Sequence, residues 1–149
     1  MKNTINILTL LTCILLQACY VPVAKPDYKS SQLGDSEIGR FIAKEYAKTK
    51  AYKRLFAEKL QSDLQNIIAN KLPKNYSQAD LRKIVSDMGM VCDDSSKNCQ
   101  YQGYIVNKAN SFGKTIAGGK AFFNVSINYQ VGMTSLKVIH NVVPLTDWK

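Results

Sequence analysis

The sequence predicts one α+β domain, in which two amphipathic helices pack on a three-stranded antiparallel sheet. In the first half of the chain, apolar residues recur at intervals of three and four, the period of a helix with one buried face. In the second half the period becomes two, as in a strand with one buried face. Because helices and strands form separate runs, the order indicates α+β rather than a parallel α/β sheet. We expect this domain to cover residues 35–149.

The first helix is predicted to begin at an N-cap, Asp35 or Ser36, and to end before Pro73. The stretch 48–51 interrupts its pattern, so the sequence is compatible with one long helix or with two. The apolar positions of this helical region are Ile38, Phe41, Ile42, Tyr46, Tyr52, Leu55, Phe56, Leu60, Leu64, Ile67, Ile68 and Leu72.

A further helix is predicted to begin at Ser77, with Asp80 placed to complete a capping box. Gly89 suits the position just after its last turn, where glycine accepts a left-handed conformation. Its apolar face consists of Leu81, Ile84, Val85 and Met88.

Three strands are predicted, over residues 101–107, 121–131 and 136–143. Residues 110–120 are rich in glycine and are predicted to form a loop, and 132–135 a turn. The middle strand alternates cleanly between apolar and polar residues, which indicates one buried and one solvated face.

The N-terminus has the parts of a secretory signal: Lys2, an apolar segment over 5–16, and Ala18 before Cys19. With Leu16-Gln17-Ala18-Cys19 as a lipobox, the chain resembles a bacterial lipoprotein precursor. The resemblance implies a signal peptide over 1–18, diacylglycerol on the thiol of Cys19, and cleavage before that residue. Residues 19–34 lack any helical or strand period, so we expect a lipid anchor and flexible tether there.

The residue after the cysteine is Tyr20 rather than aspartate. By resemblance to Gram-negative lipoproteins, this implies an outer-membrane location facing the periplasm, with surface exposure left open. The order of anchor, tether, helices, disulfide turn and sheet resembles the small outer-membrane lipoproteins of the SmpA/OmlA type, which are accessory to β-barrel assembly. That resemblance carries no functional residues over to this chain.

Cys92 and Cys99 are predicted to form a disulfide, because an oxidising periplasm favours bonding of a nearby pair. The loop that they close holds six polar or charged residues. A metal site is the alternative, but it needs two further ligands and the chain has a single histidine, His140.

The chain carries a formal net charge of +9. Export argues against a nucleic-acid partner, which leaves an anionic membrane, an acidic partner protein or a merely solvated surface. Arg40, Lys44 and Lys48 form a basic stripe on the first helix and are candidates for membrane or partner contact.

No motif for catalysis or for a cofactor is recognisable. Gly113-Lys114-Thr115 imitates the end of a phosphate-binding loop, but the required earlier glycine is replaced by Lys108, so no nucleotide partner is expected. His140 lacks the elements of a triad and is predicted to be partly buried with a satisfied hydrogen bond.

The sequence therefore predicts a non-catalytic, lipid-anchored envelope protein that binds a protein partner, as an accessory of outer-membrane assembly, secretion or conjugation. Its expected contacts are Tyr104 and Phe122, on the solvated faces of strands, and Trp148. The alternative is an inhibitor or exclusion factor that acts against a lytic enzyme or a phage.

Overall fold

The computed structural model describes residues 24–48, 56–111 and 114–144. Its elements, in chain order, are β1 (Lys25–Gln32), α2 (Glu37–Lys48), α3 (Phe56–Lys71), α4 (Gln78–Asp87), β2 (Val91–Asp93), β3 (Asn98–Ser111), β4 (Lys114–Asn128), the 3₁₀ turn η1 (Met133–Ser135) and β5 (Lys137–Pro144). All pairings between the described strands are antiparallel.

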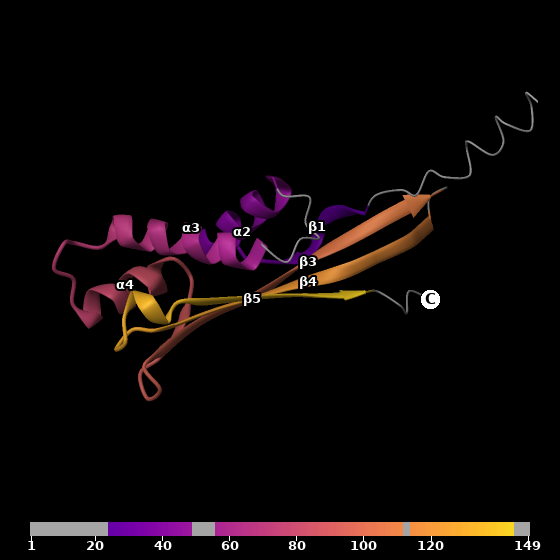
Figure 1. Cartoon of the computed structure of the whole chain (residues 1–149). Helices are drawn as coiled ribbons and strands as arrows, with labels where there is room; N and C mark the ends of the chain where they lie inside the picture. Colours follow the sequence, from indigo (N-terminus) through magenta and orange to yellow (C-terminus); the bar gives the residue numbers. More distant parts are fainter. Residues whose placement is uncertain (1–23, 49–55, 112–113, 145–149) are drawn as a thin grey trace, which may run out of the picture.

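The sheet is larger than predicted. Its order is β1-β3-β4-β5, and β2 pairs with the beginning of β3 as a fifth strand. The predicted fold of two helices on a three-stranded sheet is therefore wrong: the described residues contain three α-helices and five strands, still in an α+β arrangement. Figure 1 shows α2 and α3 along one face of the sheet, while the opposite face has no helix among the described residues.

Strand β1 lies within the range predicted to be an irregular tether. It pairs Asp27 with Val106 and then Gln32 with Tyr104, so its register shifts between these two points. A bulge of this kind breaks the alternation of side chains that reveals a strand in a sequence. This explains why residues 25–32 show no period of two.

Strand β4 includes part of the predicted glycine-rich loop. It begins at Lys114, and the long β3–β4 ladder pairs Lys108 with Gly118 and Ala109 with Ala117. At Gly119 the chain of β5 comes so close that an added Cβ would lie 2.9 Å from the carbonyl oxygen of Val143. Gly119 therefore permits close packing of strands where a loop was predicted.

The predicted helical region contains α2 and α3, and the chain between them, residues 49–55, lies outside the described residues, so the alternative of one helix or two is not tested. Ser36 is confirmed as a cap of α2, because its Oγ accepts a hydrogen bond from the Gly39 N–H at 3.0 Å. The capping box of α4 is also confirmed, with Ser77 and Asp80 each accepting from the other's backbone N–H. Gly89 follows this helix with φ +104°, as its position predicts.

The core fills the space between the helices and one face of the sheet. Its fully buried large side chains are Ile38, Ile42, Tyr46, Leu60, Leu64, Ile68, Leu81, Val85, Met88, Ile105, Phe123 and Ile127. At the end of β1, the buried hydroxyl of Tyr101 donates to the carbonyl oxygen of Leu33 at 2.5 Å. A Cβ at Gly39 would lie 2.1 Å from that same oxygen, so glycine is required where α2 crosses this turn.

Candidate functional site

The face of the sheet opposite the helices carries a concavity of about 620 Å³. We call this surface the open face. Along β3 and β4 every second side chain points away from the core, so the alternation that buries Phe123 exposes Phe122. The concavity is lined by Gln32, Gln102, Gly103, Tyr104, Phe122, Phe123, Asn124, Ile139 and Asn141.

An aromatic pair lies at this concavity. Tyr104 and Phe122 are opposite each other in the β3–β4 register, and their ring centroids are 5.7 Å apart. The ammonium of Lys120 lies 4.8 Å from the centroid of the Tyr104 ring, a cation–π contact. The structure thus brings together two of the predicted contact residues, and the third, Trp148, lies outside the described residues.

Primary amides surround the aromatic pair. Gln102 and Asn124 face each other across β3 and β4, and Asn141 of β5 lies opposite Phe122. The side-chain oxygen of Asn124 is buried and has no hydrogen-bond partner within the described residues. A buried polar atom without a partner costs about 1–3 kcal/mol of stability.

The lining also includes two residues that were not predicted from the sequence, Ile139 and Asn141. The alternation of β5 places them on the open face, yet their position beside Phe122 depends on the β4–β5 register. The sequence does not specify that register.

The predicted basic stripe lies on α2, with the helices rather than on the open face. Arg40 donates to the backbone oxygen of Asp35, and Lys48 forms an ion pair with Glu45 at 2.6 Å. Lys44 is exposed. The stripe and the aromatic pair are therefore separate surfaces, and membrane contact by the stripe stays a prediction.

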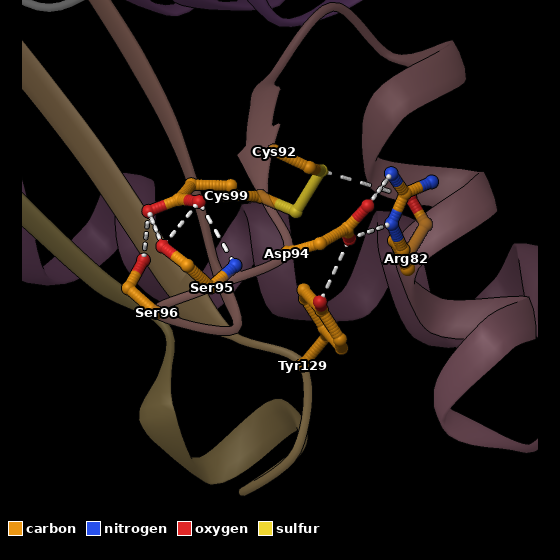
Figure 2. A network of polar contacts seen from close by, with 8 residues as sticks. Arg82, Cys92, Asp94, Ser95, Ser96, Cys99 and Tyr129 are labelled. Carbon is orange, nitrogen blue, oxygen red and sulfur yellow. Dashed lines mark hydrogen bonds and ion pairs between the residues drawn. A yellow bond between two sulfur atoms is a disulfide. The ribbon is translucent and has the colours of Figure 1, made fainter.

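The disulfide between Cys92 and Cys99 is confirmed. The two residues are opposite each other in the β2–β3 hairpin, and Figure 2 shows the bridge beside the ion pair of Arg82 with Asp94. Arg82 holds both oxygens of Asp94, at 2.7 and 2.9 Å, and the Tyr129 hydroxyl donates to the same carboxylate at 2.9 Å. These contacts connect α4, the hairpin and the end of β4.

The second carboxylate of this hairpin, Asp93, is held by the hydroxyls of Ser95 and Ser96. These hydrogen bonds stabilise the charged form and lower the pKa of Asp93 to about 2. The arrangement stabilises a turn, because Asp93 is held by its own loop and Asp94 by Arg82 and Tyr129.

His140 lies under the helices, at the covered face. Its ring stacks on Phe123 with centroids 4.9 Å apart, and Tyr46 and Phe56 pack against it edge-on. Burial lowers the pKa of His140, and its Nε2 has no partner among the described residues. The expectation of partial burial is met, but the expected hydrogen bond is not found at Nε2.

The described residues contain no group of three or more histidine, cysteine or acidic residues that could hold a metal ion. None of the described helices combines the length and apolar character needed to cross a membrane.

Comparisons with protein-family models, with curated proteins and with solved structures gave no match for this chain.

Proposed function

We propose that this chain is a non-catalytic, lipid-anchored protein of the bacterial envelope that binds a protein partner through the open face of its sheet. Its role would be that of an accessory in outer-membrane assembly, secretion or conjugation. The observation that carries the proposal is the concavity on a sheet face that none of the described helices covers, with the Tyr104–Phe122 pair beside it.

The chemistry of the lining supports binding rather than catalysis. It consists of amide, aromatic and aliphatic side chains, with one backbone glycine, and includes no carboxylate, imidazole, thiol or hydroxyl other than the Tyr104 phenol. The histidine whose pKa is shifted, His140, belongs to the covered face. Aromatic rings that present flat apolar area, with amides to fix orientation, are typical of the centre of a protein interface.

The start of the fold suits a membrane anchor at Cys19. Strand β1 begins at Lys25, so residues 19–24 span at most roughly 20 Å at about 3.5 Å per residue. A lipid on Cys19 would then hold the sheet close to the membrane surface. The basic side chains in the N-terminal part of the fold, of which Lys25 is the first, would be attracted to the anionic head groups of the lipids.

Partner binding is tested by co-purification from cross-linked envelopes, comparing the wild type with a Tyr104→Ser, Phe122→Ser double variant. We expect the double variant to lose the co-purifying protein while keeping its folded state. Tyr76→Ser is the matched control, since Tyr76 is an exposed aromatic residue outside the open face, 39% exposed against 41% for Phe122. Equal loss in the control and the double variant would refute the assignment of the interface.

Anchoring is tested by Cys19→Ser in the full-length chain. We expect this variant to leave the membrane fraction or to accumulate as an uncleaved precursor. Recovery of a mature, membrane-bound Cys19→Ser protein would show that the lipoprotein assignment is wrong, independently of partner binding.

A further inference from the structure

The two long outer strands of the sheet, β1 and β5, differ in how their free edges are protected. Edge strands expose unpaired N–H and C=O groups and invite pairing with another chain, so proteins protect them with bulges, charges and proline. Strand β1 has all three: the register shift after Asp27, the ion pair of Asp27 with Lys108 at 2.8 Å, and Pro26. This edge is closed to strand addition.

Strand β5 is the opposite edge and has little of this protection. The Val138 N–H donates to the side-chain oxygen of Gln61 at 3.1 Å, which shows that the backbone groups of Val138 point away from β4. Because these directions alternate along a strand, the N–H and C=O groups of His140 and Val142 also point outward. None of the described residues hydrogen-bonds to these outward groups.

The side chains of β5 are suited to pairing rather than to its prevention. Ile139, Val142 and Val143 are 40%, 42% and 50% exposed, on both faces of the strand. The strand has one charged residue, Lys137, at its first position, and its proline, Pro144, is the last. Between these ends the strand is uncharged, and the outward backbone groups of His140 and Val142 have no partner among the described residues.

We propose that the β5 edge receives an extended, acidic segment of the partner protein as an added antiparallel or parallel strand. This inference rests on the proposed function and names the way in which the partner binds. Strand addition uses the backbone for affinity and alternate side chains for specificity. One set of the added side chains would lie beside Ile139 and Asn141, which also line the concavity, so the edge and the open face form one continuous surface.

The positive charge of this chain favours an acidic segment over a second copy of the chain as the added strand. The chain carries +9, β5 has a lysine and no acid, and Val143 is opposite Lys120 of β4 in the register. A second copy of this chain would bring like charges together, which opposes association. A segment with carboxylates at alternate positions would instead meet Lys137, which lies on the open side of β5 opposite Ser126.

The probe is a synthetic peptide that alternates valine with glutamate, added to the full-length protein in detergent micelles. We expect it to slow amide hydrogen exchange at His140 and Val142, the two outward N–H groups. The same peptide with N-methylated backbone amides keeps its side chains but cannot complete the ladder, and it should bind roughly tenfold more weakly or worse. A valine–lysine peptide should bind more weakly than the valine–glutamate peptide.

Val142→Pro removes an outward N–H without removing a bond to β4. The peptide should then no longer slow amide hydrogen exchange at His140. Val142→Thr keeps the N–H and the branched shape, and it should bind the peptide as the wild type does. If N-methylation and Val142→Pro both leave binding unchanged, strand addition is refuted. The N-methylated peptide decides the question even if the proline variant fails to fold.

The remaining outcomes identify a different occupant and would overturn the inference. Protection of His140 and Val142 that rises with protein concentration, without peptide, would indicate a second copy. Protection already present in the free monomer would indicate that the chain covers its own edge. A partner that co-purifies with Val142→Pro but not with the Tyr104→Ser, Phe122→Ser variant would leave the proposed function standing and refute strand addition alone.

Discussion

Phe122 and Phe123 are consecutive residues of β4, and they occupy opposite environments. Phe123 is 1% exposed and packs against Tyr46, Phe56 and His140 under the helices. Phe122 is 41% exposed and contacts Tyr104 on the open face. One strand therefore supplies both surfaces: its covered side contributes to the core, whereas its open side leaves aromatic area exposed.

The largest effect should separate these two residues directly. Phe123→Ala leaves a cavity in the aromatic core and should lower the free energy of unfolding by about 3–5 kcal/mol. Phe122→Ala should lower it by about 1 kcal/mol or less, because much of the ring is already in water. Urea denaturation of the two variants measures both values. Similar losses would mean that the open face is part of the core.

The covered face is also stabilised at its end by the disulfide hairpin. Replacing Cys92 and Cys99 with serine should lower the free energy of unfolding by about 2–3 kcal/mol, because the bridge restricts the unfolded chain. Partner binding at the open face should persist at temperatures where the variant stays folded. Reductant should destabilise the wild type and leave the double variant unchanged, which provides the control.

The pH dependence of stability tests the covered face once more. Burial lowers the pKa of His140 below its ordinary 6.5. Just below pH 6.5 this imidazole is therefore protonated more readily in the unfolded chain than in the folded one. The free energy of unfolding should therefore fall as the pH drops through about 6.5. His140→Gln should remove this slope. A wild-type slope that survives in the variant would locate the titrating group elsewhere.

The features that the sequence predicted correctly depend on neighbouring residues. The capping box of Ser77 and Asp80, the glycine after α4 and the hairpin disulfide each join residues a few positions apart. The exposure of Phe122 follows from alternation within one strand. Such signals are contained in a short window, so they can be recognised without knowledge of the fold.

The features that the sequence did not predict depend on distant pairing. Strand β1 is stabilised by β3, far along the chain, where Ser31 Oγ accepts from the Val106 N–H at 2.9 Å. Its bulge hides the period of two. The glycine-rich sequence of β4 is typical of a loop, although Gly119 belongs to a strand and permits the close approach of β5. The concavity combines four strands, so Ile139 and Asn141 could not be assigned to it before the register was known.

The division between the two faces is tested most directly by site-specific photo-cross-linking in intact cells. A photoreactive amino acid is placed at Phe122 on the open face, or at Ser62, an exposed position of α3 on the covered side. We expect a discrete cross-linked partner from position 122 and none from position 62. A partner captured from position 62 and not from 122 would contradict it, because the helices would then be the binding surface.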